Sequence, residues 1–264
     1  MINELILKEK SELAKRILEH DTPYSRSKNT ILKFFDNGND TISQEIIDKQ
    51  LTIIDSYYST NMSRRYYGVE EIAETIVKIS TNKKDLKRIF IEYTKNPHNL
   101  ENVTSLFNSQ YGYNKVGDKF GQATSLISKY AYFITDFNFP IYDSIVREVY
   151  PLIKGEKLVD KNFNDFIYSM NELLTLSNID NYNQLDNFLW LIGKINRGNY
   201  SLILKKDKYL KLVDEIEFST GLDSIAKDKK IKEFINQNIE RLFEIFTNDQ
   251  LDMIKYCNSL SDKL

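Results

Sequence analysis

A glycine-rich stretch with flanking lysines precedes a strongly apolar segment near the middle of the chain. Lys119 lies between Gly117 and Gly121, and apolar residues then recur at helical spacing over residues 123–134. This pattern predicts a tight turn that leads directly into the N-terminus of a helix. Backbone N–H groups and the positive end of the dipole at such a terminus bind anions. The alternative is an ordinary turn among solvated lysines.

A single aspartate follows this helix at a second predicted helix start. Asp143 comes after Phe139-Pro-Ile-Tyr142 and before Ser144, and the next residues predict a helix that Pro151 ends near Tyr150. Aspartate is among the preferred N-cap residues, because its side chain accepts a hydrogen bond from a backbone N–H of the first turn. Helix capping is therefore the simplest role for Asp143.

Together, the segments 119–129 and 139–146 resemble the core of the helix-hairpin-helix DNA glycosylase superfamily. In that family a glycine-rich hairpin enters a helix, and a later segment of the form Pro-(Val/Ile)-x-Asp-(Thr/Ser/Gly)-x-Val carries a catalytic aspartate. The matching residues here are Pro140, Ile141, Asp143, Ser144 and Val146. With Leu185–Lys194 the likeness extends over residues 100–195, and these segments resemble poorly characterised bacterial relatives of the 8-oxoguanine and adenine glycosylases.

This resemblance implies a function as well as a fold. Asp143 would stabilise the positive charge that develops on the sugar as the N-glycosidic bond breaks, and would position water. The target nucleotide would be flipped out of the DNA stack to reach it. DNA is the expected partner, and the residues expected to hold its phosphates are Gly117, Lys119, Gly121, Gln122, Ser125 and Lys129.

The chain departs from the family pattern at the hairpin. Gly121-Gln-Ala123 stands where the family has glycine, an apolar residue and glycine, and Thr124 and Ser125 occupy the place of the lysine found in bifunctional members. The resemblance therefore implies a monofunctional hydrolase without a cofactor, and the lone Cys257 excludes an iron–sulfur cluster. Two alternatives remain open: a non-catalytic DNA-binding or protein-interaction module, and a helical scaffold unrelated to DNA.

The residues that are typical of several other enzyme classes are absent from this sequence. His20, His98 and Cys257 are the whole complement of histidine and cysteine, too few and too scattered for a zinc site. The chain has no phosphate-binding loop, no dinucleotide fingerprint and no nucleophile elbow. With 36 basic and 38 acidic residues there is no general positive field, so any nucleic-acid contact must be local.

The composition predicts an all-α protein. Nine glycines and four prolines in 264 residues leave long uninterrupted stretches, and the apolar spacing indicates helices rather than strands. We expect one compact protein over residues 1–264, built as two packed helical lobes around the glycosylase-like core at 100–195. The expected helices cover residues 3–20, 43–58, 68–80, 85–93, 100–109, 123–134, 144–150, 163–174, 185–195, 209–216 and 231–246, with a short one at the C-terminus and a loop from Pro23 to about Thr30.

Two aromatic sites and the cellular location complete the expectations. Arg64-Arg-Tyr-Tyr67 combines cations with rings of the kind that stack on bases, although packing at a helix end is the simpler interpretation. Trp190 lies in an apolar stripe and is expected in the core. The charged N-terminus, the single cysteine and the absence of a run of about 20 apolar residues predict a soluble, cytoplasmic protein that does not cross a membrane.

Overall fold

The prediction of an all-α fold is confirmed by a computed structural model, which describes residues 4–19, 22–36, 38, 40–216, 218 and 222–261. Within these ranges the regular elements are helices, and β-pairing is limited to isolated bridges. The α-helices are α1 (Glu4–Glu19), α2 (Pro23–Lys33), α3 (Gln44–Tyr58), α4 (Gly68–Ile79), α5 (Lys83–Lys95), α6 (Glu101–Asn108), α7 (Thr124–Ile134), α8 (Ser144–Lys154), α9 (Phe163–Ser177), α10 (Tyr182–Asn196), α11 (Lys206–Asp214), α12 (Ser224–Asn238) and α13 (Asn248–Ser261). Short 3-10 helices cover Met62–Arg64, Pro97–Asn99, Tyr200–Leu202 and Ile239–Arg241.

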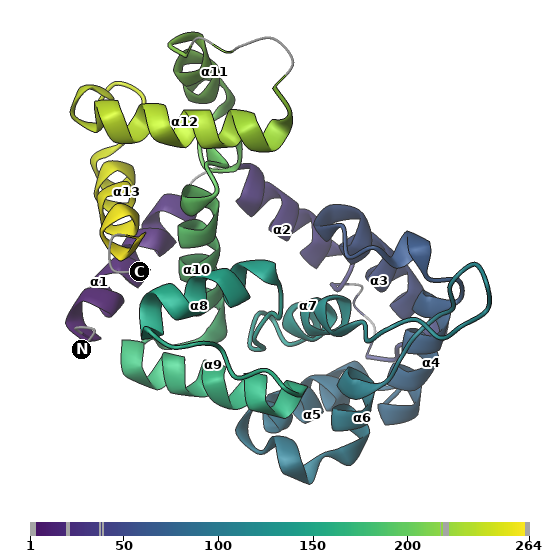
Figure 1. Cartoon of the computed structure of the whole chain (residues 1–264). Coiled ribbons are helices and arrows are strands. Elements are labelled where there is room, and N and C mark those ends of the chain that lie inside the picture. The colour runs from purple at the N-terminus through teal and green to yellow at the C-terminus, as the bar shows by residue number, and fades with distance from the viewer. Residues whose placement is uncertain are drawn as a thin grey trace.

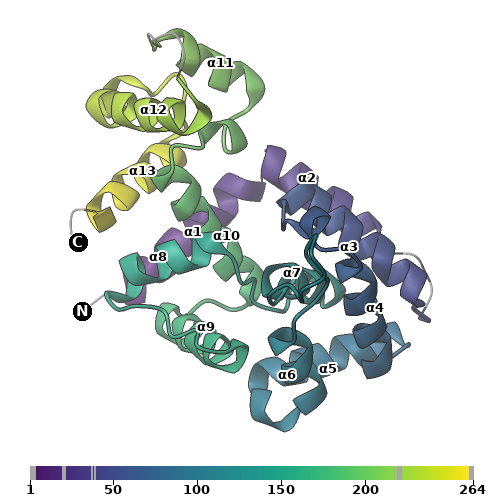
Figure 2. The same ribbon diagram turned by 45° about the vertical axis from the view of Figure 1, so that its right-hand side comes forward.

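Helix α10 lies at the centre of the molecule and packs against α1, α8 and α13. On the other side α3 packs against α4 and α7, and Figures 1 and 2 show α11 and α12 standing above α13 and the end of α10. Gly193 lets α10 approach α8 closely, since a Cβ atom there would lie 2.5 Å from Cγ2 of Ile145. Buried side chains from these helices form one continuous hydrophobic core. Helices α11 and α12 contribute little to it, namely Leu212, Ile231 and Ile235.

The expected loop after Pro23 is wrong, because residues 23–33 form α2. Thr22 accepts a hydrogen bond from the backbone N–H of Ser25, and the Ser25 hydroxyl accepts one from the N–H of Thr22. This reciprocal capping box begins a helix, and proline suits the first helical position since its missing N–H has no partner there in any case. Pro23 therefore starts a helix rather than following the end of one.

Two helix ends also differ from the expectation. Pro151 does not end α8, which continues to Lys154 and closes at Gly155 with a φ of +75°. The helix continues past the proline because Ile153 in its last turn is fully buried. The expected helix over residues 231–246 instead ends at Asn238 and passes into a 3-10 turn, and Phe243 beyond it is exposed.

The other expected helices are present, with ends that shift by a few residues. Residues 3 and 20 of the first expected helix lie outside the described residues, as do 37 and 39 in the turn before α3. Ser43 caps α3 by accepting the backbone N–H of Ile46, as the sequence predicts. In the part of the chain that the structure describes, no helix is long and apolar enough to span a membrane.

Candidate active site

The segment that carries Asp143 is held in place by a buried ring and by a hydrogen bond to α7. Phe139 is fully buried, and its ring stacks on that of Phe107 with centroids 5.7 Å apart and an interplanar angle of 8°. The backbone N–H of Tyr142 donates to Oγ of Ser128 at 3.0 Å. Since both anchors lie within four residues of Asp143, core packing sets its position relative to α7.

Asp143 is the N-cap of α8, which confirms the predicted cap. Its Oδ1 accepts the backbone N–H of Val146 at 3.0 Å, and its backbone is extended. The side chain is half-buried, and no group among the described residues donates a hydrogen bond to its Oδ2. One carboxylate oxygen thus holds the helix end while the other remains open to a ligand.

Lys129 reaches the same region from the middle of α7. Its side chain is only 3% exposed, and its Nζ donates to Oγ of Ser125 at 2.8 Å and lies 5.3 Å from the ring centroid of Tyr58. Burial lowers the pKa of Lys129, and the negative charges of Asp143 and Asp186 partly oppose that shift. Lys129 is therefore a buried amine between two carboxylates and forms no ion pair with a described residue.

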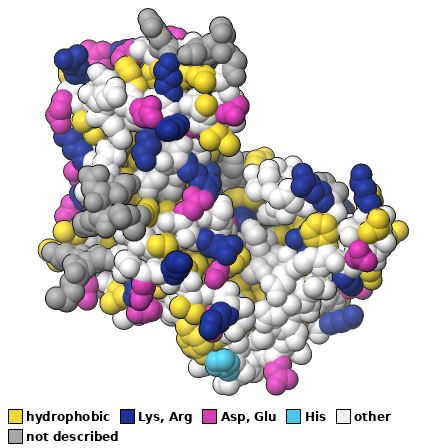
Figure 3. Space-filling view, in the orientation of Figure 1, with side chains coloured by type: hydrophobic (Ala, Val, Ile, Leu, Met, Phe, Trp, Pro, Cys, Tyr) yellow, Lys and Arg dark blue, Asp and Glu magenta, His cyan; other side chains and the backbone are white. Residues whose placement is uncertain are grey.

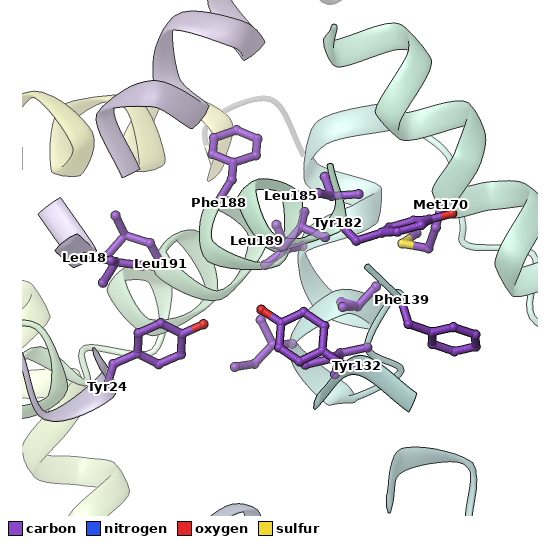
Figure 4. Close-up of a cluster of buried hydrophobic side chains, with 14 of the residues drawn as sticks. Leu18, Tyr24, Tyr132, Phe139, Met170, Tyr182, Leu185, Phe188, Leu189 and Leu191 are labelled. Carbon is purple, nitrogen blue, oxygen red and sulfur yellow. The ribbon is translucent and has the colours of Figure 1, made fainter. Parts of the chain in front are cut away.

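A second buried lysine forms a polar floor beneath these groups. Lys28 of α2 is 8% exposed, and its Nζ donates to Oη of Tyr132, to Oδ1 of Asn183 at 2.6 Å and to Oδ1 of Asn187 at 3.3 Å. Figure 4 shows the hydroxyl groups of Tyr24 and Tyr132 turned toward one another beside α10. The floor thus joins α2, α7 and α10, whose sequences lie far apart.

Asp186 of α10 completes the recess, a name we use for the cluster of four charged side chains formed by Lys28, Lys129, Asp143 and Asp186, whose charges act on one another. It is half-buried, and its Oδ2 accepts the hydroxyl of Tyr24 at 3.1 Å. Burial raises the pKa of Asp186, and the charge of Asp143 adds to that increase, while the ammonium groups of Lys28 and Lys129 oppose it. Two carboxylates and two amines therefore act on one another within the recess.

Trp190 packs against the hydrophobic core, as expected, but it is only partly buried and lies beside the recess. Its ring contacts that of Tyr24 with centroids 4.0 Å apart and is tilted by 33° relative to it. On the same helix Nζ of Lys194 lies 5.6 Å from the Trp190 ring, and burial lowers the pKa of Lys194. The edge of the recess therefore combines an aromatic surface with a cation.

A groove adjoins the recess near the start of α8. Arg197 links the two, because its Nη2 donates to Oγ of Ser144, the residue after Asp143, at 3.0 Å. The groove has a volume of 810 Å³ and lies between Glu148 of α8, the C-terminal end of α10 and the face of α12. Its lining carries both signs of charge: Arg197 pairs with Glu148 at 2.5 Å, and Asp228, Lys229, Lys232 and Glu233 lie together on α12. Figure 3 shows the surface deeply indented below the part that carries α11 and α12, with Lys and Arg side chains along the indentation.

The predicted phosphate-binding residues divide into two groups. Ser125 and Lys129 lie in the recess with Asp143, as their position in the first turns of α7 requires. The others lie on the hairpin, a name we give to residues 110–122, where Tyr113 pairs with Lys119 and Gln110 with Gln122 across antiparallel bridges. This long connection between α6 and α7 is a β-type hairpin rather than a tight turn between two helices.

The hairpin residues are engaged with neighbouring parts of the protein. Lys119 pairs with Glu71 of α4 at 2.7 Å, so a phosphate at its Nζ would compete with a carboxylate. Gly117 lies at the tip with a φ of +87°, and the guanidinium of Arg65 donates to the carbonyl oxygens of Gly121 and Gln122. These contacts fix the hairpin against the segment before α4.

The Arg64–Tyr67 segment that supports the hairpin is more exposed than the sequence suggests. Tyr66 and Tyr67 are 52% and 69% exposed, and Tyr67 has a positive φ of 61°, which is uncommon for an aromatic residue. Packing at a helix end therefore does not bury these rings. They form an aromatic surface beside the hairpin, next to the exposed Arg64.

Sequence reasoning missed Lys28, Asn183, Asp186 and Asn187. Asn183, Asp186 and Asn187 lie at helical spacing within α10 and could have been noticed as polar positions beside an apolar stripe. Lys28 was missed because it lies in α2, a segment that was expected to be a loop. Among the described residues no three His, Cys, Asp or Glu side chains come together as a metal site would require.

The charge of Lys28 leads to a prediction on pH dependence. Burial lowers the pKa of Lys28 to about 8, so between that pH and about 10.4 the unfolded chain binds more protons than the folded one. The contribution of Lys28 to the free energy of unfolding is therefore expected to rise by about 2 kcal/mol between pH 7.5 and 9.5. Denaturant unfolding of wild type and Lys28→Met at several pH values measures this difference.

The exposed Lys33 on the same helix provides the control for this prediction. Lys33→Met should follow the wild-type pH dependence, because a solvated lysine has nearly the same proton affinity in both states. Parallel pH curves for wild type and Lys28→Met would show that the ammonium of Lys28 suffers no penalty from burial.

Comparison of the chain with protein-family models, with curated proteins and with solved structures gave no match.

Proposed function

We propose that this chain is a DNA N-glycosylase of the helix-hairpin-helix type, which removes a base by hydrolysis with Asp143 as its catalytic carboxylate. The observation that carries the proposal is the position of Asp143: one oxygen caps α8, while the other is open beside a recess that holds Lys129 and Asp186. A cytoplasmic enzyme of this kind needs no metal or organic cofactor for the reaction.

The chemistry of base removal matches the groups in the recess. As the bond between C1′ and the base nitrogen breaks, positive charge develops on the sugar, and a fixed carboxylate next to it stabilises the transition state. Asp143 is held rigidly enough for that role by the Phe139 stack and by the bond from Tyr142 to Ser128. A base flipped out of the duplex would enter among Tyr58, Trp190 and the polar side chains of α10.

The proposed DNA contacts surround the recess on two sides. The first turn of α7, with Ser125, supplies N–H groups and the positive end of a helix dipole. The groove beside Ser144 supplies Arg197, Lys229 and Lys232, where Arg197 would have to leave Glu148. We include Gly117, Lys119, Gly121 and Gln122 of the hairpin as further phosphate contacts, where Lys119 would have to leave Glu71.

A non-catalytic DNA-binding or protein-interaction module is the second candidate. The observation that favours it is that Asp143 and Lys119 both have sufficient structural roles, in the cap of α8 and in the pair with Glu71. In this case DNA binding or a protein contact would persist without any change to the DNA.

The test is an assay of wild type and Asp143→Asn on duplex and single-stranded oligonucleotides that carry a panel of damaged or mismatched bases. Abasic sites are scored by alkaline cleavage, and binding is scored by mobility shift at low salt. Cleavage by wild type alone supports the glycosylase. Strand breakage before alkali treatment would contradict the monofunctional class, and binding without abasic sites would favour the second candidate.

A further inference from the structure

Asp186 is a second carboxylate at the recess, on a different helix from Asp143. The Tyr24 hydroxyl donates a hydrogen bond to Oδ2 of Asp186 at 3.1 Å and lies 2.9 Å from Oδ1 of Asn187, and the Tyr132 hydroxyl is a second hydrogen-bond partner of Asp186. Asp186 forms no ion pair with a described residue, although Lys28 and Lys129 both act on it. No cation in direct contact therefore needs the charge of Asp186, and the Tyr24 hydroxyl has Oδ1 of Asn187 as an alternative hydrogen-bond acceptor.

We propose that Asp186 is the proton donor to the departing base, the general acid of the reaction in which Asp143 stabilises the sugar. This inference rests on the proposed function and deepens it, because it assigns a residue to the leaving group. A neutral base is a poor leaving group until a ring nitrogen or exocyclic oxygen takes up a proton. The substrates we infer are therefore neutral bases.

The reaction balances with these two carboxyl groups and one water molecule. The C1′–N bond breaks and its electron pair goes to the base, which takes the proton of Asp186 at a ring atom and leaves as a neutral molecule. Water then adds its oxygen to C1′, and the proton it loses passes to a carboxylate and returns to Asp186. The net change is hydrolysis, with the enzyme restored.

The surroundings of Asp186 suit a group that must hold a proton and then release it. Burial raises the pKa of Asp186 and the nearby charge of Asp143 adds to this effect, so the protonated form persists to higher pH than in water. The ammonium groups of Lys28 and Lys129 would then stabilise the carboxylate that remains. The titratable groups around Asp186 are Tyr24 and Lys28 of α2, Tyr58 of α3, Lys129 and Tyr132 of α7, and Asp143 at the start of α8.

The test compares the single-turnover excision rates of wild type and Asp186→Asn on bases of different leaving ability. Asparagine has the same shape and still accepts a hydrogen bond from Tyr24, but it cannot donate an acidic proton. We expect the rate to fall by about 10²-fold or more on neutral bases such as 8-oxoguanine, hypoxanthine or uracil. Where N7-methylguanine is also excised, its rate should fall by only a few-fold, because this base is already positively charged and leaves without a proton.

The pH profile on any excised neutral base gives a second and independent readout. The wild-type rate should decline as pH rises through the pKa of Asp186, and Asp186→Asn should lose that decline. The exposed Asp180, just before α10, is the matched control, and Asp180→Asn should behave as wild type.

The possible outcomes separate this inference from the function on which it rests. Equal losses on charged and neutral bases, or an unchanged alkaline decline in Asp186→Asn, would overturn the role of Asp186 and leave the glycosylase intact. A wild-type protein that excises no base from the panel would overturn both.

Discussion

Asp143→Asn is expected to lower the rate of base excision by at least about 10²-fold, with little change in stability. Asparagine cannot stabilise positive charge on the sugar as a carboxylate does, and the loss of a fixed electrostatic group commonly reduces turnover by this amount. Asparagine is as good an N-cap as aspartate, so the bond from Val146 that begins α8 should persist. The measurement is the single-turnover rate together with the free energy of unfolding.

Asp143→Ala separates the two roles of this residue. Alanine removes the cap as well as the charge, so this variant should lose about 1 kcal/mol of stability in addition to its activity. An Asp143→Asn protein that is folded and excises bases at the wild-type rate would show that Asp143 serves α8 alone. That result would move the proposal to the non-catalytic module.

Gly198→Ala is expected to have the largest effect on stability, about 3 kcal/mol or more. Gly198 has a φ of +76°, which a residue with a side chain adopts only with strain, and a Cβ atom there would lie 2.1 Å from the carbonyl oxygen of Asp228. That oxygen belongs to the backbone of α12 and cannot rotate away. Alanine would therefore force the end of α10 and α12 apart at the floor of the groove.

Gly155→Ala is the matched control, because this glycine has the same backbone conformation in open space. Its φ is +75°, and no atom lies within 4 Å of a Cβ built there. This variant should lose only about 1 kcal/mol, which is the contribution of the backbone strain. Chemical denaturation of both variants measures the difference, and equal losses would show that the close approach of Gly198 to α12 is relieved at no cost.

Most of the fold follows from the sequence because the helices carry clear apolar stripes. In α3 the buried residues recur at three and four positions and Ser43 caps its start, whereas α7 is buried on all sides from Leu126 to Ile134. Helix α2 was missed because Lys28 interrupts its buried stripe between Tyr24 and Ile31, so the periodicity is hidden. In α8 the burial of Ile153 outweighed the proline, a tertiary effect that local pattern does not contain.

The site could be predicted only where its residues lie close together in the sequence. Ser125, Lys129 and Asp143 belong to one helix-turn-helix segment, and the structure brings them together. Lys28 and Asp186 come from segments far apart in the sequence and meet only through the packing of α2 beside α10. Nothing local marks such a pair, because the partner of each residue is set by tertiary contacts.

The polar floor has a consequence for how the protein folds. A helix of 11 residues, the length of α2, is not stable alone in water, so α2 forms as it docks. Partial docking would bury the ammonium of Lys28 before it reaches the oxygens of Tyr132, Asn183 and Asn187, and an unpaired buried charge is strongly unfavourable. Docking of α2 and completion of the recess are therefore one cooperative event, and backbone amides of α2 should exchange with solvent only when the recess itself opens.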